Sequence, residues 1–318
     1  MNGGDGMERY KTFNLTERFP NVLLLGNGIL RSCKVKDEKE LKSWGKYIKE
    51  LSEQTLTKKK ANQLNGLPYS LQASIITAVD DSKRQSKYSD TFVTAEFEDG
   101  ILLKNLLEIG FDSIITTNYT YEIEDAFHAG YSKLKDKLSY AKSTERDSRF
   151  LLHTYNQFDN EVPVWHIHGE LRRKSSIILT HDEYARLISH LIRENELNQD
   201  KYEKYNNEVK YKSWLDYFLM SNLYIVGLGM DFSEFDLWWI LNRRMREKAS
   251  VGKITFFKSE DDSYNVCNAL KAMNVNVISF DIDVDEKDYY NEFYKEVTEF
   301  IKKDINSLKG VKQNEEDC

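Results

Sequence analysis

The chain has 318 residues, enough for one large domain with insertions or for two domains. Charged residues make up 31% and hydrophobic residues 40%, which is typical of a globular protein and excludes a disordered one. The net charge of -7 argues against direct nucleic-acid binding, and no apolar run approaches the roughly 20 residues of a membrane span. The first residues, MNGGDGMERYK, lack the apolar core of a signal peptide, so we expect a cytoplasmic protein.

The three cysteines, Cys33, Cys267 and Cys318, are scattered along the chain and form no CxxC pair. This spacing excludes a four-cysteine zinc site and a disulfide framework, and it fits a reducing compartment. We therefore expect no zinc.

The first strand is predicted by the apolar run from Asn21, which ends in the turn Gly26, Asn27, Gly28. Glycines in such a turn let the backbone approach a phosphate, and the start of a helix offers N–H groups to it. The dinucleotide fingerprint GxGxxG is incomplete, because Ser32 and Cys33 follow. An ordinary tight turn after a strand is the alternative.

Residues 34–108 have helical patterns and few strand patterns. Trp44, Ile48 and Leu51 recur on one face of a helix, and Lys58–Lys60 is interpreted as a solvated surface run. This connection is far longer than the dozen or so residues that a crossover between parallel strands needs. We therefore predict a helical module packed over the strand ends.

A second buried strand is predicted at Ser113–Thr116, after Gly110 ends a helical pattern. Thr116, Thr117 and Asn118 place polar groups at its carboxyl end, where open α/β sheets bind ligands. Asn and Thr are also good helix caps, so this run fits an N-cap of the next helix equally well.

The run Val162–Gly169 predicts a third strand, on which His166 and His168 share a face. Two interpretations compete. One is a His-x-His metal pair that needs a third ligand, such as His181 or Asp182. The other is a single catalytic imidazole at His168, with His166 structural.

The remaining patterns continue the alternation of strands and helices. Further strands are predicted at Ser176–Thr180, Leu223–Gly227, Lys253–Lys258 and Val275–Phe280. Helices are expected to begin at His181 and at Asp231, where Asp231 and Glu234 resemble a capping pair, and at Asp262, with a last one around Tyr290–Ile301. Arg243, Arg244 and Arg246 lie near a helix end, where cations suit the helix dipole.

The alternation predicts an α/β fold with a doubly wound, mainly parallel, Rossmann-like sheet and a helical insertion module. We expect a loose start to about residue 18 and one domain over 19–308. Helical insertions are expected at about 34–108 and 121–160, and a flexible tail at 309–318.

Four strand-end motifs now stand in order, namely Gly26–Gly28, the TTNY run that ends at Tyr119, His168–Gly169 and Gly227–Asp231. Together they resemble the sirtuin-like superfamily over roughly residues 20–300. The resemblance is closer to the bacterial sirtuin-like NAD hydrolases of anti-phage defence than to the protein deacylases, whose zinc cysteines are missing here.

The resemblance implies an NADase in which NAD is the substrate and the nicotinamide–ribose bond is cleaved. Asn118 would hold the nicotinamide ribose or its attacking water, and His168 would bind a ribose hydroxyl and serve as the base. The implied cofactor-binding residues are Gly26, Asn27 and Gly28 at the pyrophosphate, Thr116 and Thr117 in the nucleotide pocket, Gly227, Leu228, Gly229 and Asp231 near the adenosine ribose, and Lys258 at that end of the cofactor.

Three positions depart from the family pattern. The first turn has Asn27 where the family has alanine, and the serine usual after the fourth strand is absent. Thr120 replaces the acid that follows the Asn–aromatic pair, and Glu122 or Glu124 is a candidate to take its place.

We expect a regulated anti-phage effector that depletes NAD and is restrained by self-assembly or by a companion protein, because free activity would be toxic. A different class of function is an NAD- or nucleotide-sensing module with a silent site, acting through a companion. Thr120 and the altered glycine turn favour sensing, whereas Asn118 and His168 oppose it. A third class, a metallohydrolase using His166 and His168, lacks a convincing third ligand.

Overall fold

The computed structural model describes residues 11–15, 17–35, 43–80, 97–127, 139–140, 156–157, 162–171, 173–204, 208–246, 251–283 and 288–313. The main sheet contains β2 (Asn21–Leu25), β5 (Ser113–Thr116), β6 (Ser139–Tyr140), β7 (Asn156–Gln157), β8 (Pro163–His166), β10 (Asn222–Val226), β11 (Ile254–Phe257) and β12 (Asn276–Ile278). Two small sheets pair β1 (Thr12–Asn14) with β9 (Glu208–Lys210) and β3 (Lys34–Val35) with β4 (Phe97–Asp99).

The helices are α1 (Gly28–Arg31), α2 (Trp44–Thr55), α3 (Lys58–Gln63), α4 (Tyr69–Val79), α6 (Ile101–Leu107), α7 (Glu122–Phe127), α8 (His181–Lys204), α9 (Trp214–Met220), α10 (Phe235–Met245), α11 (Tyr264–Ala272) and α12 (Tyr289–Gln313), with a 3-10 turn η3 (Lys174–Ser176). None of the helices in the described ranges is both long enough and apolar enough to cross a membrane.

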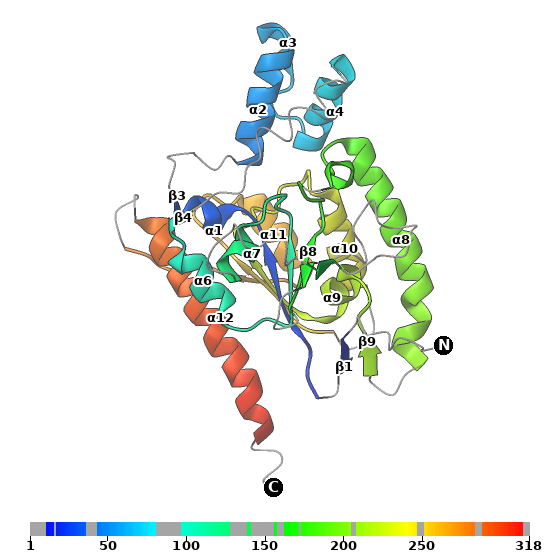
Figure 1. Ribbon diagram of the computed structural model, residues 1–318, viewed down its shortest axis with the longest axis vertical. Coiled ribbons are helices and arrows are strands. Elements are labelled where there is room, and N and C mark those ends of the chain that lie inside the picture. The colour runs from blue at the N-terminus through cyan, green and yellow to red at the C-terminus, as the bar shows by residue number, and fades with distance from the viewer. Residues whose placement is uncertain are drawn as a thin grey trace.

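The main sheet is doubly wound and mainly parallel, as the sequence predicted (Figure 1). Its strand order is β12-β11-β10-β2-β5-β8-β7-β6. The strands from β12 to β8 are parallel, β7 is antiparallel to β8, and β6 is antiparallel to β7. The chain winds outward from β2 through β5 to β8, and later continues on the other side of β2 with β10. The strand order therefore reverses between β2 and β10, and ligands of such sheets bind outside the carboxyl ends at this switch point.

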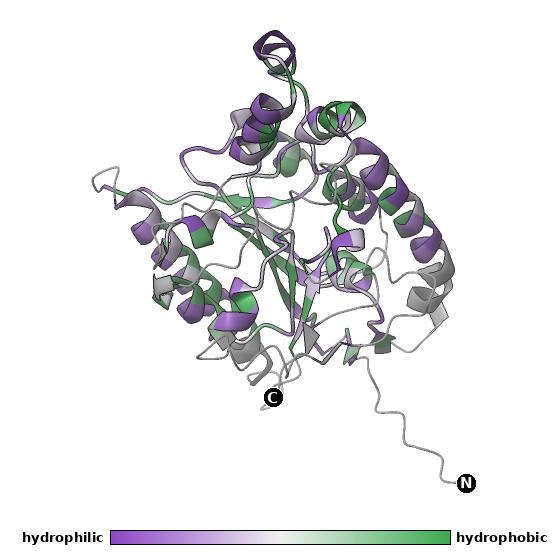
Figure 2. Cartoon of the chain, turned by 45° about the horizontal axis from the view of Figure 1, so that its top comes forward, coloured by the Kyte–Doolittle hydropathy of each residue, from purple (hydrophilic) through white to green (hydrophobic). Residues whose placement is uncertain are grey.

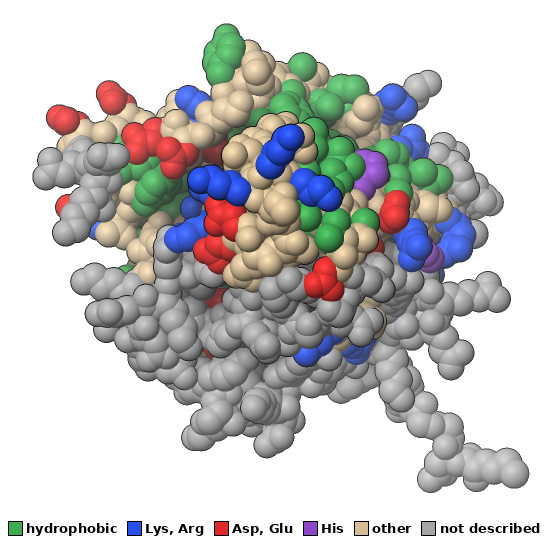
Figure 3. Space-filling model, turned by 90° about the horizontal axis from the view of Figure 1, so that it is seen from above, with side chains coloured by type: hydrophobic (Ala, Val, Ile, Leu, Met, Phe, Trp, Pro, Cys, Tyr) green, Lys and Arg blue, Asp and Glu red, His purple; other side chains and the backbone are tan. Residues whose placement is uncertain are grey.

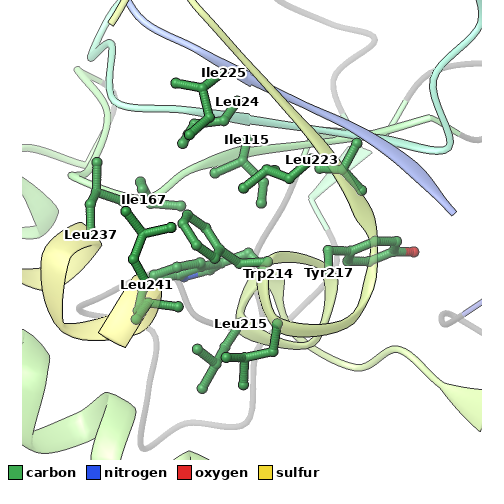
Figure 4. Close-up of a cluster of buried hydrophobic side chains, with 14 of the residues drawn as sticks. Leu24, Ile115, Ile167, Trp214, Leu215, Tyr217, Leu223, Ile225, Leu237 and Leu241 are labelled. Carbon is green, nitrogen blue, oxygen red and sulfur yellow. The ribbon is translucent and has the colours of Figure 1, made fainter. Parts of the chain in front are cut away.

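Both faces of the sheet are covered, so the central strands are apolar between helices with polar outer surfaces (Figure 2). On one face, Leu24, Ile115 and Ile225 lie in a cluster with Trp214 of α9 and Leu237 of α10 (Figure 4). Their neighbours along each strand point into a second cluster, formed with α6 and α12. Burial on both faces explains why these strands are continuous apolar runs in the sequence.

Helices α2, α3 and α4 form a module beyond the main sheet (Figure 1). Ile48 of α2 shares a hydrophobic cluster with Tyr119 and Ile177, which lie in the loops after β5 and β8. The backbone amide of Tyr69 also donates to Ser233 Oγ at 2.7 Å, in the loop after β10. The module is therefore held over the carboxyl ends of three strands.

The outer surface of this module is polar at its tip. Lys58–Lys60 of α3 are all exposed, which confirms the solvated surface run. Lys and Arg side chains, together with hydrophobic ones, are visible on the face seen from this end of the molecule (Figure 3).

The strand predicted at Ser176–Thr180 is wrong, because the chain there forms η3 and then a buried loop. The amide of Ile178 donates to the carbonyl of His168 at 2.8 Å, and the next two amides each donate to Glu183 Oε2 at 3.0 Å. A loop and a side chain thus satisfy the backbone groups that a neighbouring strand would otherwise pair.

Several short strands were not predicted. The pair β3 and β4 lies in the stretch expected to be helical, and β1 lies in the expected loose start. Strands of two or three residues show too little alternation to be recognised. Most of the insertion expected at 121–160 lies outside the described residues, as do 314–318, whereas α12 continues past residue 308.

Candidate functional site

The loops after β2 and β10 are in direct backbone contact at the switch point. The Gly28 amide donates to the Gly227 carbonyl at 2.8 Å, and the Gly26 amide donates to the Val226 carbonyl at 3.0 Å. A Cβ on Gly26 would lie 2.4 Å from the Gly227 oxygen, and one on Gly28 would lie 2.8 Å from Gly227 Cα. Gly227 itself has a φ of 64°, which favours glycine. The close packing of the two strand ends is therefore enough by itself to explain why these three positions are glycine.

The loop after β5 is tied to the sheet by Thr116. Its side chain is fully buried, and its hydroxyl donates to the Leu25 carbonyl at 2.8 Å while accepting the Asn118 amide at 3.1 Å. Helix α7 begins only at Glu122, so the Thr116–Asn118 run is not its N-cap. Thr117 and Asn118 are half-buried, at the strand end where a ligand-binding residue was predicted.

The side-chain amide nitrogen of Asn118 is buried and has no hydrogen-bond partner among the described residues. An unpaired buried donor costs about 1 to 3 kcal/mol, so such a group usually has a ligand, ion or water as its partner. Asn118 is therefore a candidate donor to a bound molecule.

His166 connects this loop to α7. Its Nδ1 lies 2.6 Å from the Asn118 carbonyl oxygen, and its Nε2 lies 2.7 Å from Glu124 Oε1. Both partners are acceptors, so both hydrogen bonds form only when both ring nitrogens carry protons. Burial disfavours the charged ring, but Glu124 outweighs it and raises the pKa of His166 to about 9. His166 is a buried cation that supports the backbone of Asn118.

His168 lies in a second cluster, with acids that the sequence did not predict. Its Nε2 is 3.0 Å from Asp236 Oδ2 and its Nδ1 is 3.6 Å from Glu234 Oε2, while the Tyr184 hydroxyl donates to Glu234 at 3.2 Å. Burial opposes the charged ring, yet the two carboxylates raise the pKa of His168. Burial also raises the pKa of Glu234 to about 7.

The predicted capping pair of Asp231 and Glu234 is wrong. Helix α10 begins at Phe235, and the Glu234 side chain makes no cap hydrogen bond. Asp231 is exposed, and its Oδ1 accepts the Ser233 amide at 2.7 Å in the turn before the helix. The acids Glu234 and Asp236 stand two residues apart after a glycine loop, which is the only local signal of their role.

The two histidines do not form the His-x-His metal pair, because each ring has its own acidic partner. Within the described ranges, the ligand atoms of His168, Glu234 and Asp236 lie within 4.8 Å of one another, close enough to share a metal ion. In the structure, the direct contact between His168 and Asp236 is a hydrogen bond made through Nε2 of the ring. His181, one of the third ligands considered, instead has its ring against Phe235, with centroids 4.9 Å apart.

The other predicted residues lie further along the sheet. Lys258 follows β11, where it is half-buried and its amide donates to the Ile278 carbonyl at 2.8 Å. A Cβ on the exposed Gly229 would lie 3.7 Å from Asp262 Oδ1. The Asp262 carboxylate accepts the amide and the hydroxyl of Ser259, and burial raises its pKa. The structure thus adds an acid beside the Gly227–Gly229 loop.

The strand order and the polar groups at the strand ends define a doubly wound α/β protein of the nucleotide-binding type. A family model described as a SIR2-like domain matches residues 112–278, just over half of the chain, so the chain belongs to the SIR2-like family. Domains of this family bind NAD as a substrate, which gives the chain an NAD-related function in general terms. The match includes Asn118 and His168 but not the Gly26–Gly28 turn. No curated protein matches the sequence.

Proposed function

We propose that the chain is an NAD hydrolase that cleaves the nicotinamide–ribose bond. The observation that carries the proposal is the placement of Asn118 and His168. Thr116 of β5 pairs with His166 of β8, and each candidate follows its strand residue by two positions. Both therefore leave neighbouring parallel strands at the same edge, where a domain of the SIR2-like family would hold its substrate.

The reaction requires little covalent work from the protein. Nicotinamide leaves as a neutral molecule by taking the electron pair of its bond to ribose, and a water molecule adds to the ribose carbon and loses a proton. The transition state resembles an oxocarbenium ion, so the site must hold the ribose, place the water and accept that proton. The unpaired amide of Asn118 suits the first two tasks, and His168 suits the third.

The proposed biological role is a regulated anti-phage effector that depletes NAD. Its support is the resemblance of the strand-end motifs to the bacterial sirtuin-like NAD hydrolases of defence systems. Constant loss of NAD would be toxic, so the activity would be held back by self-assembly or by a companion protein until infection.

The test is nicotinamide release and NAD loss by the purified chain, alone and in lysate from phage-infected cells. Asn118→Ala and His168→Ala should each abolish release. Asn118→Ala should leave the melting temperature near that of the wild type, whereas His168→Ala should lower it, because the variant leaves the buried Asp236 without its ring partner. Lys60→Ala, on the exposed surface of α3, is the matched control and should retain activity. Continued NAD loss in both site variants would refute the assignment.

A sensing module with a silent site is the second candidate. The observation that favours it is the closed glycine turn, in which the Gly28 amide is already donated to Gly227 and is not free for a phosphate. Thr120 in place of the family acid points the same way. In this case NAD should raise the melting temperature without any release of nicotinamide. A ligand that fails to shift melting would count against sensing.

A further inference from the structure

The ring of His168 is held by two acids that lie far along the chain, Glu234 just before α10 and Asp236 within it: the contact with Asp236 spans 68 positions. Asp236 is fully buried, and its Oδ2 lies 3.0 Å from His168 Nε2. Its other oxygen, Oδ1, is buried and has no hydrogen-bond partner among the described residues. In such a buried environment a hydrogen bond to a carboxylate is strong and directional, so the contact with Asp236 fixes the orientation of the His168 ring.

Glu234 differs from Asp236 in each of these respects. Its carboxylate lies 3.6 Å from His168 Nδ1, keeps 15% exposure and is shared with the Tyr184 hydroxyl. The closer and more buried acid therefore determines how the ring is oriented, and it faces Nε2. A neutral imidazole carries one N–H, and the hydrogen bond to Asp236 places it on Nε2.

We propose that Asp236 is a positioning residue that holds the Nε2–H of His168, so that Nδ1 is the nitrogen that accepts the proton of the attacking water. This inference rests on the proposed hydrolase function. A base held by a third group in this way keeps one tautomer and one orientation throughout the reaction. Asp236 does not itself touch the substrate.

Among the described residues, few titratable groups lie close enough to the His168 ring to affect its protonation. The titratable groups that face it are Asp236 from α10, Glu234 just before that helix, and Tyr184 from α8, whose ring centroid lies 5.3 Å from that of His168. Tyr119 interacts with Tyr184, and the Tyr119 hydroxyl donates to the Ile178 carbonyl at 2.8 Å. Of the two acids, Asp236 makes the shorter contact with the His168 ring.

The kinetic test compares Asp236→Asn with Asp236→Glu and with Asp281→Asn, an exposed control beyond β12. Asp236→Asn should lower kcat by about a hundredfold with little change in KM, since the base loses its orientation. Its activity should also persist to lower pH, because His168 without its carboxylate loses its proton more readily. Asp236→Glu should recover part of kcat, and Asp281→Asn should behave as the wild type.

A readout without turnover separates this inference from the proposed function. Nitrogen NMR of the His168 ring in the free protein should show the neutral form protonated at Nε2, with a pKa that falls in Asp236→Asn because the carboxylate that favours the charged ring is gone. If the wild type releases no nicotinamide but this signature is present, the hydrolase proposal fails and the His168–Asp236 arrangement stands. A neutral ring protonated at Nδ1, an unchanged pH profile, or a stoichiometric divalent ion bound by Asp236 would overturn the inference.

Discussion

The buried pair of His166 and Glu124 should make the stability of this protein depend on pH. Both side chains are almost fully buried, with Nε2 and Oε1 2.7 Å apart. Burial opposes the charge on the ring, but Glu124 raises the pKa of His166 from 6.5 to about 9. At about 1.4 kcal/mol for each pKa unit, this difference corresponds to about 3 kcal/mol of stability.

The sign follows from where the proton is bound. His166 in the unfolded chain loses its proton near its ordinary pKa of 6.5, whereas folded His166 keeps it until about pH 9. Between these values the folded state binds one proton more than the unfolded state, so the free energy of unfolding falls as the pH rises. The contribution is fully present below 6.5 and is lost as the pH passes through about 9.

Urea unfolding followed by tryptophan fluorescence from about pH 6 to about pH 9.5 measures this dependence. The control is the double variant His166→Gln with Glu124→Gln, which removes the titration without leaving one charge buried alone. Relative to this variant, the wild type should lose about 3 kcal/mol across the range. The single variant His166→Gln should be the least stable at neutral pH, because it removes the cationic ring that faces the buried Glu124. Parallel curves for the wild type and the double variant would refute the reasoning.

Three further predictions concern stability. Arg244 is buried and donates to the carbonyls of Phe218, Ser221 and Gly252, so Arg244→Met should cost about 3 kcal/mol in urea unfolding, while exposed Arg246→Ala should cost little. Gly227→Ala should lower the melting temperature more than Gly66→Ala: both have positive φ, but only the first meets backbone, at 2.9 Å. Thr116→Val should cost about 1 to 3 kcal/mol and loosen the Asn118 loop, seen as faster amide exchange of Asn118; an unchanged rate would contradict that role for the hydroxyl.

Much of the sheet was predictable because its central strands carry their signal locally. A parallel strand buried on both faces is a continuous apolar run, so β2, β5, β10 and β11 were all identified close to their observed bounds. The same patterns indicated that Asn118 and His168 follow strand ends, and the family match agrees with the fold that this implies. The buried loop at Ser176–Thr180 shows the limit of this signal. It is an apolar run like the strands, but two of its backbone amides donate to the Glu183 side chain and not to a neighbouring strand.

The sequence by itself thus determined the class of fold and two candidate residues, whereas only the tertiary structure decided their partners. His166 and Glu124 are 42 residues apart, and His168 and Asp236 are 68 apart. Which acid meets which histidine depends on β8 lying beside β5 and on α10 packing at the strand ends. Periodicity reports the burial of each segment separately, while a hydrogen-bonded pair forms only after separate segments have folded against each other.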